Sequence, residues 1–140
     1  MNTWEVSPLS YLDKRPPDYP DSRLFSQYVT VRDGTRLAVD IHLPGSEKNS
    51  TAFPAILILT PYYRRFARQP GSPNDIDDCP TIALYRDMFV PRGYALVVVD
   101  VRGSGASFGA RDGFRSPIER LDHHDVVDWV SLQWWCTGRI

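Results

Sequence analysis

Two short stretches of the chain, residues 55–60 and residues 94–99, are apolar almost without interruption and rich in β-branched side chains. Each is too short for a helix of ordinary length, and the absence of polar alternation is typical of strands buried on both faces of a parallel sheet. The second stretch ends at Asp100 and continues into a loop, residues 101–109, that contains three glycines. Open α/β sheets bind their ligands where a central strand ends in such a loop, so we expect a functional site there.

A helix is predicted between the two apolar strands. Pro80 suits a first helical position, and Ile82, Tyr85 and Phe89 follow it at helical spacing. The helix should end around residues 91–93, just before the second apolar strand. A strand, a helix and a second strand in this order form a right-handed crossover, which makes the two strands parallel.

A β-hairpin is predicted before the first apolar strand. Residues 27–32 are β-prone, the Asp-Gly pair at 33–34 is a strong turn signal, and residues 36–43 form the returning strand. Apolar and polar residues alternate in the returning strand, so its leucines, valine and isoleucine should face the core. The intervening positions, which include Asp40 and His42, should face water. We therefore expect His42 to be a solvated side chain and not a ligand.

The last predicted helix has a clear start. Ser116 offers a capping hydroxyl, Pro117 occupies the first helical position, and Glu119 completes a capping box. The helix should run to residues 134–136. Its apolar face is formed by Val126, Trp129 and Val130. The histidine pair at 123–124 lies off that face, and adjacent helical residues point about 100° apart, so the pair predicts a solvated surface and not a metal site. After a turn, the final two residues look like the start of another strand.

Composition narrows the class of protein. The 140 residues fit one domain, and 42% hydrophobic content is typical of globular proteins. We divide the chain into an extended proline-rich arm, residues 1–25, and a folded domain, residues 26–140. The net charge of −1 indicates no general attraction to nucleic acid or to an anionic membrane, and no apolar stretch is long enough to span a bilayer. Cys79 and Cys136 fit no metal or redox spacing. In the absence of an export signal, these features predict a cytoplasmic protein without metal or cofactor.

The glycine-containing loop carries two enzyme-like motifs that do not fit their context. Its glycines resemble a dinucleotide-binding fingerprint, but no helix is predicted to begin there and bind a phosphate. Residues 105–109 fit G-x-S-x-G, in which Ser107 would be the nucleophile of an α/β-hydrolase. That motif requires a strand directly before the serine and a helix directly after it. Here the strand ends too early and the next helix begins too late, so we interpret Ser107 as a residue that packs the turn.

Several segments together carry a family resemblance. They are V-R-D-G-T-R-L-A-V-D at 31–40, T-P-Y at 60–62, R-G-Y-A at 92–95, D-V-R-G-S-G-A-S at 100–107, D-W-V at 128–130, W-C at 135–136 and G-R-I at 138–140. In this order and spacing they resemble the N-terminal part of the CocE/NonD hydrolase family, which is related to the Xaa-Pro dipeptidyl peptidases and includes cocaine esterase and α-amino acid ester hydrolases. The resemblance runs from about residue 26 to the end. It implies an α/β fold: the N-terminal part of an α/β-hydrolase core, with a β-hairpin, parallel strands with crossover helices, and an incomplete sheet.

The resemblance also implies a chemistry, serine acyl transfer. A serine attacks an ester or amide carbonyl, a histidine accepts its proton, and an aspartate orients the histidine. Tyr62 matches the tyrosine whose hydroxyl forms the oxyanion hole together with a backbone N–H beside the nucleophile. Its position agrees, because it follows directly on an apolar strand, the region that supplies the second oxyanion donor. A packing role for Tyr62 stays open, and so does Tyr63 as the donor if the alignment slips by one residue.

The chain departs from the family pattern at its end. In the family the nucleophile follows directly after the segment matched by residues 138–140, and the aspartate and histidine come later. We therefore expect all three to be absent from these 140 residues, which would form an N-terminal fragment, inactive alone, of a hydrolase for a small-molecule ester or short peptide. The alternative is a non-catalytic interaction or ligand-binding module derived from the same fold.

Two further expectations concern the surface. Without the next strand of the family fold, residues 55–60 form an unprotected sheet edge, which predicts self-association. Arg64, Arg65 and Arg68 could bind an acidic group of a substrate, but a solvated surface is the better interpretation of them.

Overall fold

The computed structural model describes residue 10 and residues 15–45, 51–67 and 76–140. Its main sheet has four strands in the order β1-β2-β6-β3. Their bounds are Ser22–Thr30 for β1, Arg36–Pro44 for β2, Ala55–Thr60 for β3 and Ala95–Asp100 for β6. Two short strands, β4 (Arg65–Ala67) and β5 (Ile76–Asp78), form a separate antiparallel pair. Within residues 15–45, 51–67 and 76–140 the helices are α2 (Pro80–Phe89), which continues into the 3-10 turn η2 (Val90–Arg92), and α3 (Pro117–Ser131).

The strand pairing confirms the predicted hairpin and the predicted parallel pair. β1 and β2 are antiparallel and close at Thr30 and Arg36, and β3 runs parallel to β6 with Thr60 opposite Asp100. β6 lies between β2 and β3. The first strand begins earlier than the predicted residue 27: β1 starts at Ser22, because residues 22–26 pair with residues 40–44 of β2.

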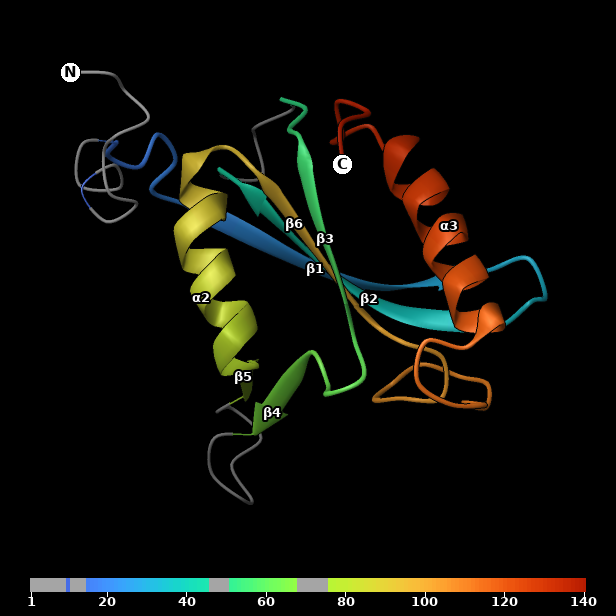
Figure 1. The fold of residues 1–140 in the computed structure, drawn as a ribbon. Helices are drawn as coiled ribbons and strands as arrows, with labels where there is room; N and C mark the ends of the chain where they lie inside the picture. Colours follow the sequence, from blue (N-terminus) through green and yellow to red (C-terminus); the bar gives the residue numbers. More distant parts are fainter. Residues whose placement is uncertain (1–9, 11–14, 46–50, 68–75) are drawn as a thin grey trace.

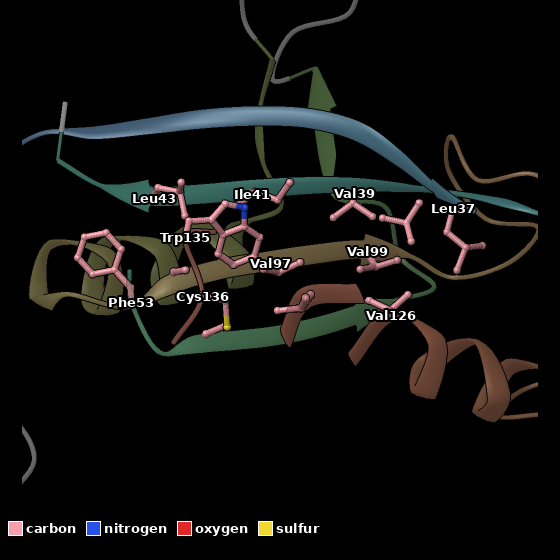
Figure 2. Close-up of a cluster of buried hydrophobic side chains, with 14 of the residues drawn as sticks. Leu37, Val39, Ile41, Leu43, Phe53, Val97, Val99, Val126, Trp135 and Cys136 are labelled. Carbon is pink, nitrogen blue, oxygen red and sulfur yellow. The ribbon is translucent and has the colours of Figure 1, made fainter. Parts of the chain in front are cut away.

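One helix covers each side of the sheet (Figure 1). On the α3 side, alternate residues of β2 and β6 form the larger apolar cluster together with Val126 and Val130 (Figure 2). On the α2 side, Ile82 packs against Leu96 and Val98 of β6. Both faces of β6 are therefore covered and all six of its residues are buried, which explains why its sequence is apolar without alternation.

Both helices begin where the sequence predicts. α2 starts at Pro80, and at the start of α3 the Ser116 Oγ accepts a hydrogen bond of 3.2 Å from the N–H of Glu119. This bond satisfies one of the donors that a helix start leaves unpaired. Within the described ranges no helix is long and apolar enough to cross a membrane.

The end of α3 differs from the prediction, since the helix stops at Ser131, short of residues 134–136. The chain turns back there because the next segment pairs with the start of β3. The N–H of Phe53 donates to the carbonyl of Trp135 at 2.8 Å, and the N–H of Ala55 donates to the carbonyl of Arg139 at 2.8 Å. Trp135 is buried in the apolar cluster. The predicted start of another strand at residues 139–140 thus lies beside β3.

Candidate functional site

Two loops meet at the carboxyl edge of the sheet. We call residues 61–64, which follow β3, the tyrosine loop, and residues 101–109, which follow β6, the glycine loop. Because β3 and β6 are parallel and in register, both loops leave the sheet at the same edge. The N–H of Val101 donates to the carbonyl of Thr60 at 3.0 Å, and the Ser104 hydroxyl donates to the carbonyl of Pro61 at 2.9 Å. The loops are therefore joined directly.

The carboxylate of Asp100, at the end of β6, accepts hydrogen bonds from both loops. Its side chain is buried, and its Oδ1 accepts the backbone N–H of Arg64 at 2.9 Å. Its Oδ2 accepts the Arg64 Nε–H at 2.9 Å and the backbone N–H of Ala106 at 3.1 Å. Gly105 is required beside it, since a Cβ there would lie 2.8 Å from Oδ1 and closer still to Oδ2. The small residue thus lets the glycine loop pass over the carboxylate.

Asp40 was predicted to face water, and that prediction is wrong: only 1% of the residue is exposed. Its carboxylate pairs with the guanidinium of Arg64, accepts a hydrogen bond of 2.7 Å from the Nε of Arg65, and accepts one of 2.6 Å from the hydroxyl of Ser26. The chain that follows β3 folds back over this part of β2 and brings the two arginines with it. The interpretation of Arg64 and Arg65 as solvated is therefore also wrong, whereas Arg68 lies outside the described residues.

His42 is a second correction on the same strand, since it is buried and not solvated. The β4–β5 pair lies over it, and the Nε2 of His42 lies 3.5 Å from the Oδ2 of Asp78. Burial alone would raise the pKa of Asp78, but its contacts with His42 and Arg86 outweigh burial and lower that pKa. His42 and Asp78 are both buried, and their contact joins β2 to the β4–β5 pair.

Arg102 joins the glycine loop to the hairpin turn and to α3. Its guanidinium donates to both oxygens of the buried Asp122, at 2.8 and 2.7 Å, to Asp33 at 2.7 Å and to the hydroxyl of Thr35 at 2.9 Å. The hydrogen bond from Arg102, and then those from Thr35, hold the pKa of Asp33 well below its ordinary value. The bonds to Asp122 and then to Asp33 raise the pKa of Arg102. Arg32 also contacts Asp122, at 3.0 Å.

The contacts of Ser107 agree with a packing role. Its hydroxyl donates to the carbonyl of Asp100 at 2.6 Å and accepts the N–H of Ala38 at 2.8 Å, which ties the loop to β2. No helix begins at the glycines of the dinucleotide-like motif, because α3 does not begin until Pro117. Neither motif of the glycine loop is followed directly by the helix that its function requires.

Tyr62 and Tyr63 project from the tyrosine loop. The side chains are exposed, 71% of Tyr62 and 54% of Tyr63, while the backbone around them is held by the bonds described above. The N–H of Tyr62 donates to the hydroxyl of Thr60 at 3.0 Å. Tyr63 has a φ of 69°, a left-handed conformation uncommon for a residue with a Cβ. A hollow of about 530 Å³ opens beside Tyr63 and is also lined by Asp40 and Asp100.

The remaining sequence candidates lie away from these loops. On α3, the Nε2 of His123 lies 4.0 Å from Glu119 and the Nδ1 of His124 lies 3.2 Å from Asp128, so the two rings face different neighbours. The thiols of Cys79 and Cys136 are both free. The sequence reasoning missed the carboxylate–arginine clusters around Asp40, Asp100 and Asp122. For Asp40 and Asp100 the signal in the sequence was a carboxylate in a strand pattern of apolar residues, whereas Asp122 lies on α3.

A hairpin that leads into a parallel pair, a crossover helix between the two parallel strands, and an exposed tyrosine at the carboxyl end of the first of them define the N-terminal part of an α/β-hydrolase-like fold. Residues 33–140 match the family described as X-Pro dipeptidyl-peptidase (S15 family). The chain belongs to this family, whose members include serine esterases and peptidases, and it covers the N-terminal part.

Individual relatives agree with this assignment. The chain is 44% identical over 131 residues to a Mycobacterium bovis protein that is provisionally named a serine esterase, a match covering 89% of this chain and 20% of the relative. It is 32% identical to the cocaine esterase of a Rhodococcus species, over 80% of this chain and 17% of the relative. The chain therefore spans about one fifth of the length of these relatives. A solved α-amino acid ester hydrolase is 27% identical, with a TM-score of 0.61 over 95% of this chain and 23% of that one.

Proposed function

We propose that the chain is the N-terminal part of a CocE/NonD-type serine hydrolase for ester or amide bonds, in which the hydroxyl of Tyr62 donates to the oxyanion. The observation that supports this most directly is the placement of Tyr62: its phenol is exposed to a reactant, while its backbone is hydrogen-bonded to Thr60 and the adjoining carbonyl of Pro61 is bonded to Ser104. A mobile donor would have to be ordered during the reaction, whereas a fixed donor can stabilise the developing charge without being reorganised.

In this chemistry a serine hydroxyl attacks the substrate carbonyl, and negative charge develops on the carbonyl oxygen. Tyr62 would donate its O–H to that oxygen, with a backbone N–H beside the nucleophile as the second donor. The substrates we propose are small-molecule esters or short peptides, the classes for which the relatives are named. The two free thiols agree with a cytoplasmic location, where cysteines stay reduced.

We further propose that the 140 residues alone are catalytically inactive. Ser107 uses its hydroxyl to tie the glycine loop to β2, and His42 is buried against Asp78. The purified chain should give no saturable turnover of p-nitrophenyl acetate and no labelling by a fluorophosphonate probe. Turnover accompanied by a label on Ser107 would overturn this part of the proposal. The DNA downstream of codon 140 provides a second test, since we expect it to encode an in-frame nucleophile motif.

The role of Tyr62 is tested by Tyr62→Phe in a product of the same gene that contains the nucleophile. Loss of one oxyanion donor should lower kcat by about 100- to 1000-fold with little change in KM, because the interaction forms mainly in the transition state. Tyr63→Phe is the matched control and should change kcat less than about threefold. If Tyr63→Phe shows the large loss instead, Tyr63 is the donor.

The second candidate, an association module, is favoured by the edge strand β3. In the described part of the chain β3 pairs with β6 on one side and, on the other, only at its start. Residues 56–59 line a hollow of about 530 Å³ together with Tyr85 and Phe89 of α2. An apolar strand edge of this kind can pair with another chain, so we propose that the 140 residues associate with themselves through β3.

A further inference from the structure

We propose that Asp100 is a positioning residue for the oxyanion tyrosine: its carboxylate sets the distance between the tyrosine loop and the glycine loop. The proposal rests on the proposed function of Tyr62 and adds the group that holds the loop in place. It is carried by three hydrogen bonds from two loops that converge on one buried carboxylate.

The charge and the burial of Asp100 make this arrangement effective. An ionised carboxylate accepts at both oxygens, and its bonds to N–H donors are stronger than those between neutral groups. Only 2% of the residue is exposed, so water does not compete well for these oxygens. The backbone N–H groups of Arg64 and Ala106 belong to residues that are themselves partly or fully exposed. Among the described residues, Asp100 is the acceptor that the structure gives for each of these two amides.

The bond to the N–H of Arg64 matters more for positioning than the ion pair with its side chain. Asp40 also pairs with the Arg64 guanidinium, but it accepts no backbone N–H from the tyrosine loop. Asp100 fixes the loop just after the two tyrosines, and Ser104 fixes it just before them at the carbonyl of Pro61. The loop is thus held on both sides of its reactive side chain, in each case by a residue of the D-V-R-G-S motif.

The conformation of Tyr63 supports the same conclusion. A non-glycine residue with a φ of 69° is disfavoured and persists only where neighbouring contacts enforce it. The next residue along the chain donates its N–H to Asp100, which is the contact that holds the chain in this conformation. We expect loss of the acceptor to let Tyr63 return to a common conformation and to move Tyr62 with it. An oxyanion donor must be fixed in place to be effective, so such a movement would weaken it.

The test is backbone amide hydrogen exchange, followed by NMR on the ¹⁵N-labelled 140-residue chain. In the wild type, the amides of Arg64 and Ala106 should be protected although their residues lie in loops. In Asp100→Asn one carboxylate oxygen becomes an NH₂ group that cannot accept, so at least one of these two amides should exchange about tenfold faster or more. Asp40→Asn is the matched control: it perturbs the same arginine but should leave both amides within about twofold of the wild type.

The outcomes separate positioning from a general loss of stability. Faster exchange at Arg64 or Ala106, with Val126 and Val130 of α3 unchanged, supports the proposal. Equal acceleration throughout the chain, or equal effects of Asp100→Asn and Asp40→Asn, overturns it. Unprotected amides at Arg64 and Ala106 in the wild type overturn it as well, and this measurement needs no variant. None of these readouts depends on catalysis, so failure of Tyr62→Phe to lower kcat would refute the proposed function and leave the result on Asp100 standing.

Discussion

The stability of the fold should depend strongly on Arg102, and Arg102→Met tests this. The guanidinium makes four hydrogen bonds, to Asp122 twice, to Asp33 and to Thr35, which join the glycine loop, the hairpin turn and α3. Methionine retains an apolar stem of similar length but removes every donor. The variant therefore leaves the Asp122 carboxylate, 1% exposed, without its principal partner.

The expected loss in the free energy of unfolding follows from the burial of Asp122. Removing one partner of a buried ion pair costs about 3–5 kcal/mol, because the remaining charge stays away from water without compensation. Arg32 still lies 3.0 Å from Asp122, so the loss should fall near the lower end, about 3 kcal/mol. The bond to Asp33 contributes less, because Asp33 is exposed and solvent screens its charge.

The assay is urea unfolding followed by tryptophan fluorescence, to which Trp129 and Trp135, in or against the larger apolar cluster, contribute. Arg120→Met, at an exposed position of α3, is the matched control and should change the free energy of unfolding by no more than about 0.5 kcal/mol. Adding Asp122→Asn to Arg102→Met should recover part of the loss, because it removes the stranded charge. A loss below about 1 kcal/mol for Arg102→Met, or no recovery in the double variant, would refute the reasoning.

Three further predictions concern stability and association. Arg102 lowers the pKa of Asp33, so the stability from this pair is present above about pH 4 and is lost as the pH falls toward the folded-state pKa of Asp33. In thermal melts, Asp33→Asn should therefore flatten the fall of Tm between about pH 4 and pH 2. An unchanged acid slope would contradict this. Gly105→Ala should lower the free energy of unfolding in urea by about 2 kcal/mol or more, since its Cβ would strike the Asp100 carboxylate. Gly34→Ala, also at positive φ but with no atom within 4 Å of the added Cβ, should lower it by about 1 kcal/mol. Equal losses would count against the close approach at Gly105. Self-association through β3 predicts that the sedimentation coefficient rises with concentration and that Tyr85→Glu, which places a charge beside this edge, reduces the rise; a wild type that stays monomeric at high concentration would refute it.

The regular elements of this protein were determined largely by local sequence. The apolar runs of β3 and β6 predict strands because they are short and rich in branched side chains. All residues of β6 are buried, whereas the middle of β3, at the edge of the sheet, is half-buried. Pro80 and Ser116 mark the helix starts through the fixed φ of proline and the capping hydroxyl of serine, which are properties of a few neighbouring residues. The hairpin turn at 33–34 is local in the same sense. The family resemblance also came from the sequence alone, and the family match confirms it.

The surroundings of the polar side chains were decided by tertiary structure. Asp40 and His42 occupy alternate positions that would face water on an isolated hairpin, and they are buried because the chain after β3 returns and covers them with arginines and the β4–β5 pair. The end of α3 was likewise set by a distant partner, the start of β3, which draws Trp135 back to the sheet. Sequence periodicity reports which face a residue occupies, but not what later covers that face. In the sequence, the polar residues of the glycine loop therefore resemble enzyme motifs. Only the tertiary structure shows that they connect the tyrosine loop, the hairpin and α3.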